Sequence, residues 1–191
     1  MSKVLPILFN TDMVRAILDG RKTVTRRVVK NIPDKEWYVG KSAIGTGLFD
    51  KSTAQGILYA PYQRGDILYV RETFAQIAKH TFLYKAGINS ELKNILWRPS
   101  IHMPKEAARI WLQVINVRVE QLRDITKEQI VKEGMDFDME HIGILGEHYD
   151  IPFAALWNST IKKADLALYG WDANPWVWVI EFVRCAKPEE N

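Results

Sequence analysis

The chain contains a single cysteine, Cys185, among its 191 residues. One thiol excludes an internal disulfide framework and a zinc site built from several cysteines, and it fits a reducing compartment. Long apolar runs are also missing, because no stretch of 18 residues, the length that a membrane span needs, is free of charged side chains. The segment 1–6 lacks the continuous apolar core of a secretory signal. We therefore expect a cytoplasmic protein without a membrane span.

Several short motifs that identify large enzyme classes are absent. The sequence has no GxxxxGK[ST] phosphate loop, no GxGxxG dinucleotide turn, no GxSxG nucleophile elbow and no HExxH zinc motif. Two of its four histidines follow glutamates, in Glu140-His141 and Glu147-His148, but this spacing fits no established metal-ligand motif. An acidic surface loop is the simpler interpretation, and we predict neither a metal nor a cofactor.

Charge is distributed unevenly along the chain. The net charge of +3 is too small to indicate nucleic-acid binding by itself. Residues 21–30, however, hold five lysines and arginines and no acid, whereas residues 136–150 hold five acids and no lysine or arginine. We therefore expect one end of the molecule to be positively polarised.

The first third of the chain predicts a strand, a short helix and a long insertion. Residues 6–10 are typical of a short buried strand, and Thr11 is a suitable N-cap for a helix that Gly20 ends in a left-handed turn. Residues 31–56 hold glycines and small polar residues between apolar segments. They indicate a loop with room for one hairpin, and hence an insertion.

The remainder of the chain predicts strands mixed with short helices. Strands are indicated at 67–74, 82–85, 109–122, where the second half has a polar face, and from Pro175 onward. Thr126 and Gln129 form a capping box for a helix that runs to Gly134, and a second helix begins after Asp150. This order predicts one α+β domain over 1–191, a small β-barrel decorated by short helices, with insertions near 31–56 and 136–150.

The basic run Gly20–Arg27, "GRKTVTRR", offers one set of reactive groups. The Thr25 hydroxyl becomes a nucleophile only if a base takes its proton, and Lys22 can act as that base if burial or nearby cations lower its pKa. A carboxylate would then be needed to orient the lysine. A Lys-x-x-Thr pair is common by chance, so a solvated basic loop is the simpler interpretation from the residues alone.

A second candidate is the proline-bounded loop "WRPSIHMP", which holds Trp97, Arg98 and His102. A loop tryptophan beside an arginine can stack on a nucleobase while the cation holds a phosphate or a base edge. Ordinary packing of Trp97 is the alternative interpretation.

Several segments together resemble the ASCH domain family, which shares the PUA-like β-barrel of RNA-modification proteins. They are, in order, "PILFNTDMVRAILDGRKTVTRR", "GDILYVRE", "WRPSIHMP", "ITKEQIVKEGM" and "NPWVWVIEF". The chain is most similar to the longer ASCH proteins of bacteriophages and prophages. The resemblance implies a PUA-like fold and a pocket that binds RNA or a modified nucleoside.

The basic run is also similar to the GRKTxTxR motif of small bacterial ASCH proteins that are N4-acetylcytidine amidohydrolases. This resemblance implies a catalytic role for Lys22 and Thr25, with Glu133 as the orienting carboxylate and Glu72 as its competitor. A wider set of residues is then expected to bind the ligand, namely Arg21, Arg26, Arg27, Arg71, Glu72, Trp97, Arg98 and His102.

Two other functions stay open from the sequence. The chain is nearly twice the size of the small hydrolases that share the motif, so the pocket can belong to a non-catalytic RNA-binding module. In that case several arginines would contact phosphate, and the affinity would fall with salt. A phage accessory protein that binds another protein, of unknown identity, through its acidic segment is the third interpretation.

Overall fold

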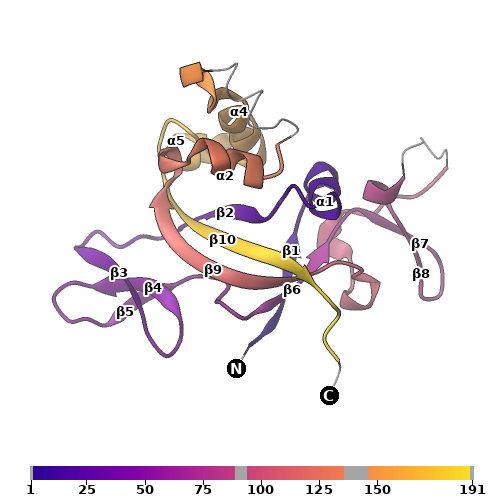
Figure 1. Cartoon of the computed structure of the whole chain (residues 1–191), viewed down its shortest axis with the longest axis horizontal. Coiled ribbons are helices and arrows are strands. Elements are labelled where there is room, and N and C mark those ends of the chain that lie inside the picture. Colours follow the sequence, from indigo (N-terminus) through magenta and orange to yellow (C-terminus); the bar gives the residue numbers. More distant parts are fainter. Residues whose placement is uncertain (1, 89–93, 136–145, 190–191) are drawn as a thin grey trace.

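The structure is a computed structural model that describes residues 2–88, 94–135 and 146–189 (Figure 1). Its centre is a five-stranded sheet in which β1 runs parallel to β6 and the other neighbours are antiparallel. Figure 1 shows the two longest strands curving together across the molecule. In spatial order the strands are β1 (Val4–Leu8), β6 (Ile67–Arg71), β9 (Trp111–Gln121), β10 (Trp176–Cys185) and β2 (Val24–Val28).

Two smaller sheets lie at opposite ends of the central sheet (Figure 1). One has three strands, β3 (Trp37–Lys41), β4 (Thr46–Asp50) and β5 (Gly56–Tyr59). The other is the hairpin of β7 (Phe74–Ala78) and β8 (Thr81–Tyr84). With short helices beside these sheets, the chain has the mixed α+β fold that the sequence predicts.

The predicted hairpin within 31–56 is present as β3 and β4, which pair antiparallel, and Gly56 at the end of this segment begins the third strand, β5. The glycines that suggested a loop are strand residues that make room for aromatic rings. A Cβ atom on Gly40 would lie 2.9 Å from the ring of Phe49, and one on Gly47 would lie 2.9 Å from the ring of Tyr59. Glycine in a strand often marks such a close approach.

Helix α1 (Thr11–Leu18) follows β1 directly. Its N-cap is Asn10, whose Oδ1 accepts a hydrogen bond of 2.8 Å from the Met13 N–H, so the prediction of Thr11 as the cap was wrong by one residue. Asparagine at this position satisfies an otherwise unpaired N–H group of the first turn. Gly20 ends the helix region with φ of 78°, as the sequence predicts.

Three further helices, α2 (Lys127–Lys132), α4 (Ile151–Thr160) and α5 (Leu166–Tyr169), lie together above the central sheet (Figure 1). The predicted capping box of Thr126 and Gln129 begins α2. Asp150 stands at the N-cap of α4, but its side chain makes no capping hydrogen bond. Trp157 of α4 donates its Nε1–H to the carbonyl of Tyr169, 2.8 Å away, which joins α4 to α5.

The central sheet has a buried core on each face. One core contains Ile17 of α1 together with sheet residues such as Leu68 and Ile180. The other contains Val24 and Val179 of the sheet with Trp157 and its neighbours on the helices. Strand β2, at the edge of the sheet, therefore contributes to the core that α2 and α4 cover.

None of the helices in the described ranges is long and apolar enough to cross a membrane. Most of the predicted insertion at 136–150, including Glu140 and His141, lies outside the described residues.

Candidate functional site

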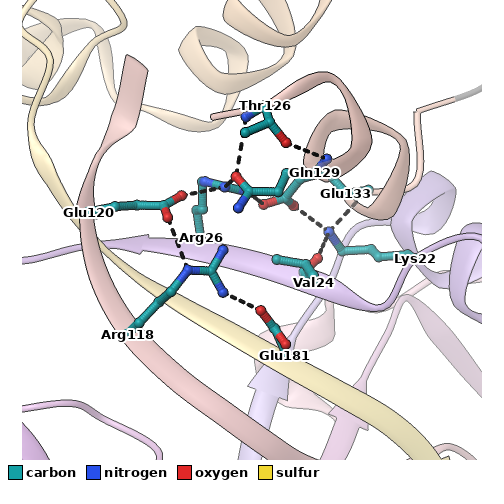
Figure 2. Close-up of polar contacts among 9 residues, drawn as sticks. All are labelled: Lys22, Val24, Arg26, Arg118, Glu120, Thr126, Gln129, Glu133 and Glu181. Atoms are coloured by element: carbon teal, nitrogen blue, oxygen red, sulfur yellow. Dashed lines mark hydrogen bonds and ion pairs between the residues drawn. The ribbon is translucent and has the colours of Figure 1, made fainter. Parts of the chain in front are cut away.

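Lys22 lies in the turn between α1 and β2, with its side chain completely buried. Its Nζ donates three hydrogen bonds, to the carbonyl of Val24 at 2.8 Å, to the carbonyl of Glu133 at 2.9 Å and to Oε2 of Glu133 at 2.7 Å (Figure 2). An ammonium group has three N–H donors, so these three acceptors use all of them. The lysine therefore links the start of β2 to the end of α2.

Opposing influences act on the ionisation of Lys22. Burial lowers the pKa of its ammonium below the usual value, because the charged form loses its hydration. The carboxylate of Glu133 acts in the opposite direction, and the nearby cations Arg27 and Arg26 add to the lowering of the pKa. The Nζ atom also lies 5.6 Å from the centre of the Phe9 ring.

Glu133 occupies the C-cap of α2, 111 residues from Lys22 in the sequence. Its two carboxylate oxygens have different partners, because Oε2 binds Lys22 and Oε1 accepts from Arg26 at 2.8 Å. The backbone supports the same arrangement through a 2.9 Å hydrogen bond from the Thr23 N–H to the carbonyl of Lys132. The buried carboxylate is therefore shared between two cations.

Arg26 extends this contact into a network of alternating charges (Figure 2). Its Nη2 lies 2.5 Å from Oε1 of Glu120 and 2.5 Å from Oε1 of Gln129. Glu120 also accepts from Arg118 at 3.0 Å, and Arg118 pairs with Glu181. Glu120, Gln129, Arg118 and Glu181 were not predicted as site residues, since their contacts depend on how β9 and β10 align with β2.

Thr25 lies beside this network with its hydroxyl unused. Alternation along β2 places its side chain on the face opposite to Arg26. The residue is only 2% exposed, and its hydroxyl makes no hydrogen bond within the described part of the chain. A hydroxyl without a protein partner can still bind a water molecule or a ligand.

A cavity of about 30 Å³ borders Thr25 at the edge of β2. That volume has room for about one water molecule and is far below the 300 Å³ or more of typical small-molecule pockets. Its polar wall is formed by Thr25, Arg26, Arg27 and Glu133, and its apolar wall contains Met13 with Phe153, Leu156 and Trp157 of α4. Helix α4 therefore occupies space that a larger ligand would need.

The other arginines of the basic run contact backbone carbonyls. Arg21 donates to the carbonyls of Gly134 at 3.0 Å and Met135 at 3.3 Å, just after α2. Arg27 is half-buried, donates to the carbonyl of Leu8 at 3.0 Å and lies 5.4 Å from the centre of the Phe9 ring.

The competing carboxylate, Glu72, has a different partner. It is 1% exposed and forms two hydrogen bonds with Arg109, of 2.9 and 3.0 Å. Arg109 in turn lies 4.2 Å from the centre of the Tyr84 ring. Of the two candidate carboxylates, the one in contact with Lys22 is therefore Glu133.

The residues of the "WRPSIHMP" loop lie further from Lys22 along a chain of contacts. Phe9, which borders Lys22, donates its N–H to the carbonyl of Arg71, and the Arg71 side chain donates to the carbonyl of Ile101. In the loop itself Trp97 is half-buried, whereas Arg98 and His102 are exposed. Arg98 pairs through its backbone with Phe74 at the start of β7.

These observations define a mixed α+β protein in which an edge strand, a helix C-terminus and a covering helix enclose a buried Lys-Glu-Arg cluster and a free hydroxyl. No protein-family model matches the chain, and no curated protein does.

Two solved structures are similar to this fold. Protein EF3133 from Enterococcus faecalis, described as a DUF984 protein, matches with 9% identity and a TM-score of 0.42, over 100% of this chain and 86% of its own. An ASCH domain from Lactobacillus crispatus matches with 11% identity and a TM-score of 0.42, over 95% of this chain and 79% of its own. The second belongs to the family that the sequence motifs resemble.

Proposed function

We propose that the chain hydrolyses the amide of an N4-acylated cytidine, with Thr25 as nucleophile, Lys22 as base and Glu133 as the residue that orients Lys22. One observation carries the proposal: Glu133, which forms a buried 2.7 Å ion pair with Lys22, lines the same cavity as Thr25, whose hydroxyl makes no hydrogen bond within the described residues. The match of the basic run to the GRKTxTxR motif gives the substrate class.

The chemistry requires Lys22 to lose one proton before the reaction. The neutral amine takes the proton of Thr25 while Oγ1 bonds to the acyl carbon, and the C–N4 bond then breaks as Lys22 returns the proton to the departing amine. Water next attacks the acyl-threonine, which releases the carboxylic acid and restores the hydroxyl. Burial and neighbouring cations favour the neutral amine that the first step needs.

Substrate binding requires the cavity to widen. A cytosine ring is much larger than a single water molecule, so α4 must move away from β2 to admit it. The side chains Phe153, Leu156 and Trp157 would then offer an apolar wall to the ring, and Arg27 would place a positive charge near the oxyanion that forms.

The direct experiment incubates the purified chain with N4-acetylcytidine and measures cytidine and acetate by chromatography. We expect turnover by the wild type, loss of at least 100-fold in Lys22→Ala and Thr25→Val, and retention of activity in Thr25→Ser, which keeps the hydroxyl. Lys30→Ala is the matched control, since Lys30 is an exposed lysine just beyond the same strand. A wild type without turnover contradicts the proposal.

We propose as a second function RNA binding without turnover, in which Lys22 has only a structural role. All three N–H donors of Lys22 already have acceptors, as expected of a lysine that only holds β2 against α2. In that case the wild type binds RNA oligonucleotides without releasing acetate, and its affinity falls as salt rises. The exposed Arg98 is the residue to replace first, and Arg98→Ala then weakens binding.

A further inference from the structure

Arg26 occupies a position that the GRKTxTxR motif leaves open, since the motif specifies its neighbours Thr25 and Arg27. The side chain is nevertheless 1% exposed, and its two terminal nitrogens contact acceptors on two elements. Burying a guanidinium is costly unless acceptors surround it. This degree of burial and pairing indicates a specific role for Arg26 beside Lys22.

The geometry divides the charge of one carboxylate between two cations. Oε2 of Glu133 faces Lys22 at 2.7 Å, while Oε1 faces Arg26 at 2.8 Å. On the far side of Arg26, Glu120 lies at 2.5 Å. A stronger interaction of Arg26 with Glu133 therefore weakens the interaction of Glu133 with the protonated Lys22. Glu120 reduces this effect, because it also attracts Arg26.

We propose that Arg26 is a positioning residue that, held by Glu120, sets how firmly Glu133 keeps the proton on Lys22. The inference rests on the proposed function for its meaning in catalysis. The effect of Arg26 on the protonation of Lys22 arises within the buried cluster, so it can be measured without any substrate.

The same network connects the buried pair with the surface. Side-chain exposure rises from 1% at Arg26 to 15% at Glu120, 29% at Arg118 and 31% at Glu181. Arg26 and Arg118 face the same residue of β10, Val179, which places the two arginines in one row across three strands. The hydrogen bond that joins Arg118 to the cluster is the one to Glu120.

The experiment follows the titration of Lys22 by NMR of its ¹⁵Nζ resonance. The charged groups that face Lys22 are Glu133 from α2 and Arg26 and Arg27 from β2. Arg26→Gln removes a cation and leaves Glu133 to Lys22 alone, so the midpoint should rise by about one pH unit. Glu120→Gln removes an anion and frees Arg26 for Glu133, so the midpoint should fall.

Opposite shifts in these two variants support the proposal. Shifts in the same direction, or no shift in either, overturn it. Arg118→Gln is the matched control, because it removes one charge from the same network without touching Glu133, and a shift as large as that of Glu120→Gln also overturns the proposal. If Arg26→Gln does not fold, the sign of the Glu120→Gln shift decides.

Activity gives a second readout. In an active enzyme, kcat should rise with pH as Lys22 loses its proton, and this rising limb of the pH–kcat profile should move with the NMR midpoint in each variant. Arg26→Lys, which keeps the charge, should restore the wild-type limb. A lower kcat without a displaced limb would reveal a purely structural arginine and overturn the proposal. A wild type without turnover contradicts the proposed hydrolase, while the NMR titration still decides the role of Arg26.

Discussion

Gly134 packs against Lys22 so closely that a Cβ atom on the glycine would lie 2.8 Å from the Cβ atom of the lysine. The same Cβ atom would lie 2.7 Å from that of Ala16 on α1. Gly134 also has φ of 87°, which L side chains rarely adopt. The end of α2 therefore reaches Lys22 only because the residue after Glu133 has no side chain.

Replacement of Gly134 by alanine should accordingly destabilise the fold and disturb the site. Strain at a positive φ costs about 1 kcal/mol, and overlap with Lys22 and Ala16 should add about 1–3 kcal/mol. Urea unfolding measures the change. Gly20→Ala is a close control, since Gly20 also follows a helix, with φ of 78°, but has open space around its missing side chain. Equal losses in both variants would show that overlap at Gly134 contributes nothing.

The two buried carboxylates should respond differently to mutation. Arg109→Met deprives Glu72 of its ion-pair partner and should cost about 3–5 kcal/mol of unfolding free energy, while turnover per folded molecule stays unchanged. Glu133→Gln should abolish turnover, because Lys22 loses its orienting carboxylate. Thermal unfolding and the N4-acetylcytidine assay on both variants test this assignment. Loss of turnover in folded Arg109→Met would contradict this assignment and show that Glu72 belongs to the catalytic site.

Features that depend on neighbours in the sequence were predicted well. The capping box of Thr126 and Gln129 and the left-handed Gly20 are local patterns, and both are present. The hairpin predicted within 31–56 is present as well, but the sequence alone did not place Gly40 and Gly47 inside its strands and against aromatic rings. Their role depends on strand pairing, which no local pattern specifies.

The residues of the candidate site also divide into those that local sequence predicts and those that depend on tertiary structure. Lys22 and Thr25 were selected from the basic run and its resemblance, and the structure places Glu133 in contact with Lys22. The polar second half of β9 was recognised, but the partner of Glu120 was not, since Arg26 lies 94 residues away and two strands across. The position of α4 at the cavity that Thr25 borders also could not be predicted, because it depends on tertiary packing.

Widening the cavity should help the substrate to bind. Leu156→Ala removes an α4 side chain from the cavity wall, so we expect KM for N4-acetylcytidine to fall several-fold as less movement of α4 is needed. Ile151→Ala is the matched control, since Ile151 is on the same helix and of the same size but is 59% exposed. A KM that is unchanged in Leu156→Ala, or that falls equally in both variants, would show that α4 does not restrict access.

The buried lysine should also leave a signature in the dependence of stability on pH. Unfolded Lys22 titrates near pH 10.5, and burial lowers its pKa in the folded protein. Between the two values the unfolded chain binds more protons, so this group makes the free energy of unfolding rise with pH. Below the folded pKa both states are protonated, and the contribution of Lys22 becomes constant.

Lys22→Met should lack this rise. Urea unfolding at intervals from pH 7 to 10 should show the wild type gaining stability relative to Lys22→Met as the pH increases. Tyr62 and Tyr84, whose pKa values burial raises, work in the opposite direction, but they do so in both proteins and cancel in the comparison. A difference that stays flat or shrinks with rising pH would mean that Glu133 outweighs burial. Lys22 would then remain an ammonium and could not serve as the base.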